Sequence, residues 1–193
     1  DGGPLALGPT EDLPWLKAQT RLTFARVGVV DPLSLADYEA HGGLTGLCRA
    51  LGMDRPAIVQ EVTDSGLRGR GGAGFPTGIK WKTVSEAKAD RKYIVCNADE
   101  GDSAPFADRM LMEGDPFTLI EGMVIAGLAT GATKGFVYIR SEYPDAVAVM
   151  SEAAAIARQA GILGAAVMGS SHAFDMEVRV GAGAYVCGEE TSL

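Results

Sequence analysis

The stretch KYIVCNADEGD, residues 92–102, decides the fold, because a short apolar run of strand type leads directly into a polar turn. Two further strand-type runs follow, GFVYIR at 135–140 and FDMEVRV at 174–180. Helical patterns over 117–130 and 141–159 separate the three runs, with short connections. This order predicts an α/β fold, with a Rossmann-like, mostly parallel sheet flanked by helices.

The chain ahead of this pattern has a different character. We predict two parts, an N-terminal arm with helices over residues 1–64 and an α/β domain over residues 65–193. Residues 1–34 are rich in proline and irregular, and are expected to pack on the body as an arm.

Three helices are expected between that arm and the first strand. A helical pattern covers residues 35–51 and is weakened by glycines. Pro56 suits the first turn of a second helix that runs to Asp64. Thr77 is a candidate N-cap for a third, over 79–87.

Composition excludes several classes of function. The net charge of -8 makes non-specific nucleic-acid binding unfavourable. No segment has the length and apolarity of a membrane span, and the first residues do not resemble a secretory signal. Three scattered cysteines argue against a disulfide framework, a metal site or an iron–sulfur cluster built from this stretch. A reducing, cytoplasmic location is expected.

Glycine is the outlier in composition. There are 26 glycines, and six of them fall between residues 66 and 78. The loop RGRGGAGFPTGIKW, residues 68–81, therefore offers backbone N–H groups to a phosphate or a flat ring. Arg68, Arg70 and Lys80 add positive charge, and Phe75 adds a stacking surface. The loop is neither a P-loop nor a standard Rossmann fingerprint, and a flexible surface loop is the alternative.

Two polar segments follow the first and third strands, where ligands of parallel sheets bind. The turn NADEGD, residues 97–102, crowds carboxylates together. It is compatible with binding ribityl or ribose hydroxyls, with a Mg²⁺ or Ca²⁺ site, or with a solvated acidic turn. The segment GAGAYVCGEETSL, residues 181–193, repeats the glycine pattern, and its glutamates could also cap a helix. With two histidines and no GxSxG motif, hydrolase chemistry has little support.

The three segments together resemble, in order, the hallmark motifs of one flavoprotein family. This is the complex I 51-kDa-like family, the FMN- and NAD(H)-binding subunit of NADH:quinone oxidoreductase, NAD-reducing hydrogenases and NAD-dependent formate dehydrogenases. The similarity runs from about residue 65 to residue 193, and is weak over residues 1–50. It implies a diaphorase, in which a hydride passes directly between NAD(H) and FMN without a catalytic acid or base.

The resemblance also implies the cofactor-binding residues. NAD(H) would stack its nicotinamide on the flavin, Phe75 would stack on adenine, and Glu190 would fix the nicotinamide end. The implied FMN and NAD(H) contacts are Gly69, Arg70, Gly71, Gly72, Phe75, Lys80, Asn97, Asp99, Glu100, Gly101, Asp102, Tyr185, Gly188, Glu189 and Glu190. No metal ligand is implied.

Two departures from the complex I pattern refine the expectation. Asp102 stands where a longer glutamate is usual beside the nicotinamide, and Thr83 stands where some members carry a second adenine-stacking aromatic. The run NADEGD–FADRMLMEGDPF–LIEGM is most similar to the beta subunit of cytosolic molybdenum formate dehydrogenases. That parent complex is expected first, with complex I or an NAD-reducing hydrogenase as alternatives.

The expected partners are the other subunits of such a complex. They include an iron–sulfur gamma-type subunit and a molybdenum alpha-type subunit, with no direct membrane insertion. Family members continue beyond this stretch and carry a [4Fe-4S] cluster there, so the cluster is expected only in a missing C-terminal part. A flavin-free scaffold or assembly element is the alternative of another class.

Overall fold

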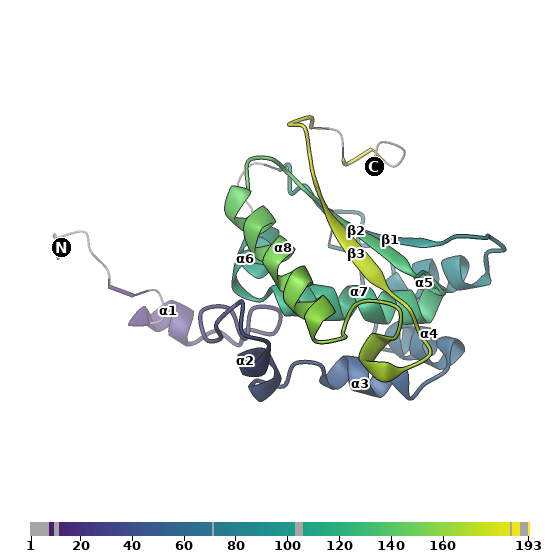
Figure 1. The fold of residues 1–193 in the computed structure, drawn as a ribbon. Helices are drawn as coiled ribbons and strands as arrows, with labels where there is room; N and C mark the ends of the chain where they lie inside the picture. Colours follow the sequence, from purple (N-terminus) through teal and green to yellow (C-terminus); the bar gives the residue numbers. More distant parts are fainter. Residues whose placement is uncertain (1–7, 10–11, 71, 103–105, 186, 190–192) are drawn as a thin grey trace.

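The computed structural model describes residues 8–9, 12–70, 72–102, 106–185, 187–189 and 193. Its sheet has the three parallel strands expected, in the spatial order β1-β2-β3. Their bounds are β1 Tyr93–Ala98, β2 Lys134–Ile139 and β3 Asp175–Val180, each within one residue of the runs predicted at 92–97, 135–140 and 174–180. The α/β class predicted from the strand and helix order is thus confirmed (Figure 1).

Two helices cover one face of the sheet (Figure 1). They are α7, Pro116–Thr130, and α8, Pro144–Gln159, which connect β1 to β2 and β2 to β3. Each opens on a proline, and Gly131 ends α7 in the left-handed region at φ 82°. The inward strand residues Val137, Ile139 and Met176 are fully buried against these helices. The opposite sheet face stays open, since Tyr93 and Val95 are each 48% exposed.

A further layer of helices packs against the side of α7 that faces away from the sheet (Figure 1). It comprises α3 Thr45–Leu51, α4 Arg55–Asp64 and α5 Thr77–Glu86. α4 begins and ends as expected, with Asp54 accepting a hydrogen bond from the amide of Ala57 at 2.8 Å. α7 is therefore covered by protein over most of its surface, which explains why its sequence is mostly apolar.

Four features of the helical part differ from the prediction. The pattern over residues 35–51 is split into α2, Leu35–Ala40, and α3, with Leu44 left-handed at φ 61° between them. Pro76, not Thr77, occupies the N-cap of α5, so Thr77 is the first helical residue. An additional helix, α6 Ala107–Gly114, follows the polar turn, and a 3₁₀ turn η2 covers Val167–Gly169.

The N-terminal arm packs on the body only through its later part. Its first helix, α1 Pro14–Lys17, stands away from the body (Figure 1), and Trp15 is 75% exposed. Arg26 then reaches the body and forms an ion pair of 2.9 Å with Asp115. The arm is thus anchored near residue 26.

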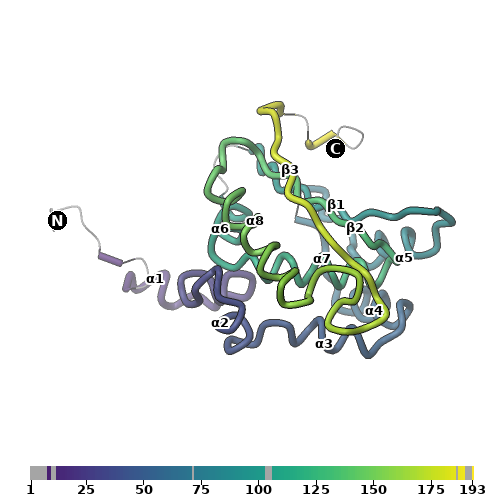
Figure 2. Tube along the Cα trace, viewed as in Figure 1, coloured from purple at the N-terminus to yellow at the C-terminus, as the bar shows by residue number. Residues whose placement is uncertain are grey.

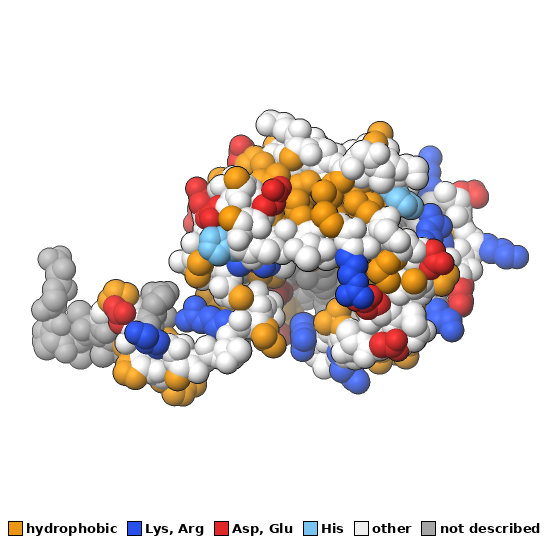
Figure 3. All heavy atoms as spheres, turned by 90° about the horizontal axis from the view of Figure 1, so that it is seen from below, with side chains coloured by type: hydrophobic (Ala, Val, Ile, Leu, Met, Phe, Trp, Pro, Cys, Tyr) orange, Lys and Arg blue, Asp and Glu red, His pale blue; other side chains and the backbone are white. Residues whose placement is uncertain are grey.

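Charged side chains of both signs lie on the face of the molecule seen from below (Figure 3). Seen from below, Lys and Arg side chains alternate with Asp and Glu side chains instead of forming a basic patch (Figure 3). In the described part of the chain, no helix is long and apolar enough to cross a membrane.

Candidate cofactor site

The site lies at the carboxyl end of the sheet. β1 and β3 run parallel on either side of β2, so the segments that follow them leave from the same edge. The trace leaves β3 there and continues beyond the end of the sheet (Figure 2). The expectation that residues 97–102 and 181–189 meet at one edge follows from this topology.

Three contacts join these two segments. The side-chain amide of Asn97 donates to the carbonyl of Cys187 at 2.9 Å, and the Tyr185 hydroxyl donates to Asp102 Oδ1 at 3.1 Å. Gly101 lies under the Tyr185 ring, because a Cβ at this position would come within 2.7 Å of ring carbons. The predicted residues Asn97, Gly101, Asp102 and Tyr185 therefore form one cluster.

Asp99 is the buried acid of this cluster, with 8% of its surface exposed. Burial raises the pKa of the Cys187 thiol, and the Asp99 carboxylate raises it further. The pKa of Tyr138 is raised by burial, by Cys187 and by Asp99. Arg140 lies within electrostatic reach of the same carboxylate. A carboxylate among protonated thiol and phenol groups remains an acceptor for donors that approach from outside the chain.

Glu100 has a different role from its neighbours in this structure. Its backbone is left-handed, at φ 45°, and its carbonyl accepts from Arg140 Nη1 at 3.0 Å. Its carboxylate accepts from the amides of Asp108 at 2.8 Å and Arg109 at 3.1 Å, at the N-terminus of α6. These bonds satisfy free N–H groups of the helix. A flavin contact by this carboxylate stays a prediction.

The glycine loop forms a small hairpin of its own. The amide of Gly69 donates to the carbonyl of Phe75 at 2.9 Å, and Arg68 Nε donates to the carbonyl of Gly74 at 2.6 Å. Gly72 and Gly74 have positive φ, at 87° and 56°, which explains the glycines at the turn. These hydrogen bonds lie within the loop, so its approach to the strand ends stays a prediction.

The loop nevertheless presents the groups that a nucleotide needs. Phe75 is 47% exposed, and Lys80 Nζ lies 5.9 Å from the centre of its ring. A Cβ at Gly69 would lie 3.5 Å from the same Nζ, and Arg70 is exposed. A stacking face, a cation and open backbone therefore occur together.

The roles of four further predicted site residues rest on the resemblance alone. Gly71 and Glu190 lie outside the described residues. Gly188 has open space around its Cα, and Glu189 makes an interaction within the chain. The roles of these four residues stay predictions.

The carboxylates of the polar turn take part in hydrogen bonds within the chain. Among the described residues, no group of three or more His, Cys, Asp or Glu side chains could hold a metal ion. Asp102 instead accepts from Tyr185, and Glu100 caps α6. This geometry favours hydrogen bonding over metal binding for the turn.

Two residues of the cluster were missed from the sequence, namely Tyr138 and Arg140, which belong to β2 or directly follow it. The available signal was strand register, because a parallel partner places Tyr138 beside Asn97. Arg140 Nε is buried and has no hydrogen-bond partner among the described residues. The middle strand thus supplies groups between the two polar segments.

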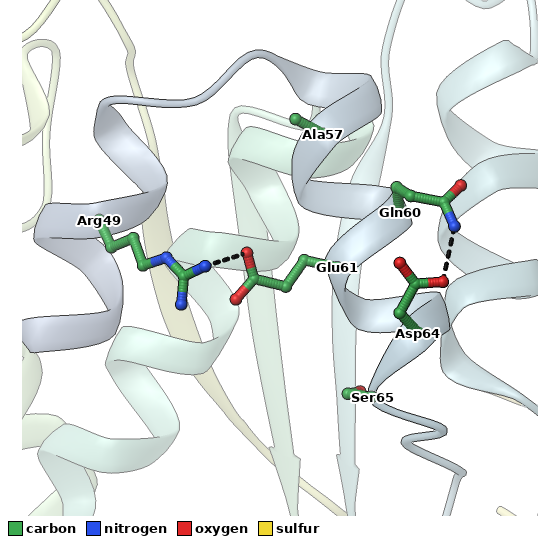
Figure 4. Close-up of a pocket in the computed structure, with 6 residues that line it drawn as sticks. All are labelled: Arg49, Ala57, Gln60, Glu61, Asp64 and Ser65. Atoms are coloured by element: carbon green, nitrogen blue, oxygen red, sulfur yellow. Dashed lines mark hydrogen bonds and ion pairs between the residues drawn. The ribbon is translucent and has the colours of Figure 1, made fainter.

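A separate surface hollow lies between α3 and α4 (Figure 4). Its polar side chains pair with one another, Arg49 with Glu61 at 2.8 Å and Gln60 with Asp64 at 2.7 Å. It contains none of the residues predicted to bind a cofactor, and nothing in it points to a ligand.

Comparison with known proteins agrees with the motif-based expectation. A family model described as the Nuo51 FMN-binding domain matches residues 62–193. The chain is 52% identical over 177 residues to the NADP-reducing hydrogenase subunit HndC of Solidesulfovibrio fructosivorans, covering 92% of this chain and 36% of that protein. It is 49% identical over 168 residues to an NADH-quinone oxidoreductase subunit of Rhizobium meliloti (strain 1021), covering 86% of this chain and 40% of that protein.

Solved structures show the same relationship. A chain of an NAD⁺-reducing NiFe hydrogenase in the H₂-reduced state superposes with a TM-score of 0.65 at 34% identity, covering 96% of this chain and 30% of that chain. The air-oxidised form gives a TM-score of 0.61 at 36% identity, covering 89% and 26%. The present chain therefore spans well under half the length of these relatives.

Proposed function

The chain belongs to the family of the Nuo51 FMN-binding domain, and from that premise we propose that it forms the diaphorase module of a larger redox complex. Bound FMN would supply hydride transfer with NAD(H) and single-electron transfer to iron–sulfur centres. The chain itself binds and orients the two molecules. The observation that carries the proposal is the meeting of residues 97–102 with residues 181–189 around buried Asp99.

The residues at the strand ends suit a flavin. Asp99 is a buried acceptor and Arg140 Nε is a buried donor without a partner among the described residues, and both suit the hydroxyls and heteroatoms of such a ligand. Because Gly101 has no side chain, the backbone of the turn can approach the ring of Tyr185 closely. Exposed rings of Phe75 and Tyr185 offer flat surfaces.

Each part of the chain has a binding role in this proposal. The glycine loop presents N–H groups, with Arg70 and Lys80 as cations, to phosphate. Asn97, Asp99 and Asp102 accept or donate hydrogen bonds at the strand ends, and Phe75 stacks on adenine. The remaining proposed contacts are Gly69, Gly71, Gly72, Glu100, Gly101, Tyr185, Gly188, Glu189 and Glu190.

A direct test is the absorption spectrum of the purified full-length protein. A flavin spectrum with bound FMN, and NADH-dependent reduction of ferricyanide, are expected. Protein that stays colourless after refolding with excess FMN would contradict the proposal and favour the flavin-free scaffold.

The parent complex is a finer proposal. The run over residues 97–123 leads us to place the chain in the beta subunit of a cytoplasmic, NAD-dependent formate dehydrogenase. The relatives described above bear hydrogenase and NADH-quinone oxidoreductase names, so those complexes are the alternatives. A [4Fe-4S] cluster would lie in sequence beyond this stretch.

Affinity purification with metal analysis separates these parents. Molybdenum with formate-dependent NAD⁺ reduction is expected, together with an iron–sulfur partner subunit. Nickel with hydrogen-dependent activity, or co-purification of quinone-linked membrane subunits, would replace the formate dehydrogenase assignment without removing the diaphorase proposal.

A further inference from the structure

Tyr138 occupies a central place on the open face of the sheet. It lies on β2, the middle strand, in register with Asn97 on β1 and Arg179 on β3. The side chains of Asn97 and Tyr138 therefore stand next to each other, one residue before the strands end. Asn97 already bonds the 181–189 segment, through the carbonyl of Cys187.

Tyr138 lies close to the 181–189 segment both where the segment begins, at Gly181, and near its end, at Cys187. A Cβ at Gly181 would lie 2.8 Å from the Tyr138 hydroxyl, so only glycine lets the chain pass beneath that oxygen. The thiol of Cys187 raises the pKa of this hydroxyl and the backbone of Ala182 lowers it, so both groups lie near the hydroxyl. The amide of Gly181 donates to the carbonyl of Ile139 at 2.7 Å, which extends the pairing of β2 past the end of β3.

These contacts make Tyr138 the point where the loop returns to the sheet. Residues 181 and 182 leave the sheet beneath its hydroxyl, and Cys187 comes back to it between Tyr138, Asn97 and Asp99. The intervening Tyr185 reaches across to Asp102. The Tyr138 side chain therefore helps to fix the position of residues 181–185 and 187–189.

We infer that Tyr138 is a positioning residue of the cofactor site: its hydroxyl holds residues 181–185 and 187–189 over the end of β2 and opposite the 97–102 turn. The part of this inference that concerns FMN rests on the proposed function. The part that concerns the loop rests on the contacts alone.

The test compares Tyr138→Phe with Tyr93→Phe in the full-length protein. Tyr93 is a matched control, because it is a tyrosine on the same sheet face at the opposite end of β1, with its ring 5.9 Å from that of Phe136. Both substitutions keep the ring and remove only the hydroxyl. Gly181→Ala is a second, independent variant, since its methyl group would collide with the Tyr138 hydroxyl.

The first readout needs no flavin. Alkylation of Cys187 by iodoacetamide in flavin-free protein, followed by peptide mass spectrometry, reports how firmly the segment is held. Rates are compared per thiolate, from their dependence on pH, because the Tyr138 hydroxyl itself lowers the pKa of the Cys187 thiol. On that basis we expect Tyr138→Phe and Gly181→Ala to accelerate the reaction about fivefold, the size of one lost neutral hydrogen bond. Tyr93→Phe should leave it unchanged. An unchanged Cys187 rate in both test variants would overturn the inference.

The second readout is the dissociation constant of FMN, measured from flavin fluorescence. It should rise about fivefold in Tyr138→Phe, while the melting temperature stays that of wild type. Faster alkylation with an unchanged FMN constant would overturn the role at the cofactor site. If wild-type protein binds no FMN, the proposed function fails, and the alkylation rates still decide whether Tyr138 holds the loop.

Discussion

Gly101 lies between the Asp99 carboxylate and the ring of Tyr185. A Cβ there would come within 2.7 Å of the ring and 2.9 Å of Asp99 Oδ2. The ring is 76% exposed and can swing away, whereas Asp99 is buried. A side chain at residue 101 would therefore displace Tyr185 and break its hydrogen bond to Asp102.

Gly101→Ala should accordingly damage the site more than the fold. We expect the KM for NADH to rise about fivefold, the size of one lost hydrogen bond, with a melting temperature close to that of wild type. Steady-state ferricyanide reduction and thermal unfolding measure the two effects.

Gly122→Ala is the matched control for this substitution. Gly122 lies in α7, is exposed, and has open space around its Cα. Alanine there should stabilise the protein by about 0.5–1 kcal/mol through helix propensity, with no change in KM. Equal KM values for the two alanine variants would refute the role of Gly101.

Cys96 provides a prediction about pH. Burial and the Asp108 carboxylate raise the pKa of this thiol to about 12, from 9.0. Above pH 9 the unfolded chain loses this proton and the folded chain keeps it, so stability is complete below pH 9 and falls as the pH rises toward 12. For this one thiol the slope approaches about 1.4 kcal/mol per pH unit.

Urea unfolding of wild type and Cys96→Ala between pH 7 and pH 10.5 measures this slope. The alanine variant should be less stable at pH 7, and its disadvantage should shrink above pH 9. Curves that run parallel over the whole pH range would show that the thiol ionises equally in both states.

Among the elements, the strands were predicted well and the helical turns were not. Short apolar runs such as GFVYIR can be recognised as strands from the local sequence alone. In the structure every second residue of β2 is buried, as expected for a strand with one covered face. The break between α2 and α3 depends instead on Glu121, a residue of α7 that accepts from the amides of Leu44 and Leu47 at 2.9 and 2.8 Å. No pattern near residue 44 contains that information.

α6 was missed for the same reason. Its first amides are capped by the carboxylate of Glu100, seven residues before the helix begins, and not by a residue at its own N-cap. The site shows the same division. Asn97 and Asp99 follow a recognisable strand, whereas the parts played by Tyr138 and Arg140 appear only once the strands are in register.

The carboxylate of Glu121 forms three hydrogen bonds that connect α7 to the N-terminal helices. Besides the two amides, its carboxylate accepts a hydrogen bond from the Tyr38 hydroxyl. Glu121→Ala would leave these donors unpaired at partly buried positions, at a cost of about 2–4 kcal/mol. Chemical unfolding should show this loss, together with faster hydrogen exchange at Leu44 and Leu47.

The exposed glutamate Glu152 of α8 supplies the control. Glu152→Ala should change the free energy of unfolding by less than about 0.5 kcal/mol. If Glu121→Ala were equally mild, the N-terminal helices would have to be held by apolar packing alone.

At the scale of the whole molecule, the negative charge near the strand ends disfavours the additional phosphate group that distinguishes NADPH from NADH. The chain carries a net charge of -8, and Asp99, Glu100 and Asp102 gather at the carboxyl edge of the sheet, where Arg140 offsets part of their negative charge. The basic residues of the glycine loop belong to a separate hairpin. A coenzyme whose ribose phosphate lies near the acidic turn would meet like charges.

We therefore predict a preference for NADH over NADPH of about tenfold or more in kcat/KM, measured by ferricyanide reduction in the full-length protein. Asp102→Asn should narrow this preference, because it removes an exposed negative charge. Glu152→Gln, the same change of charge on α8, should not. One relative is named an NADP-reducing hydrogenase subunit, which makes the measurement decisive. Comparable kcat/KM values for NADH and NADPH in wild type would show that the acidic turn does not face the coenzyme's ribose, and that the cations of the glycine loop govern coenzyme choice.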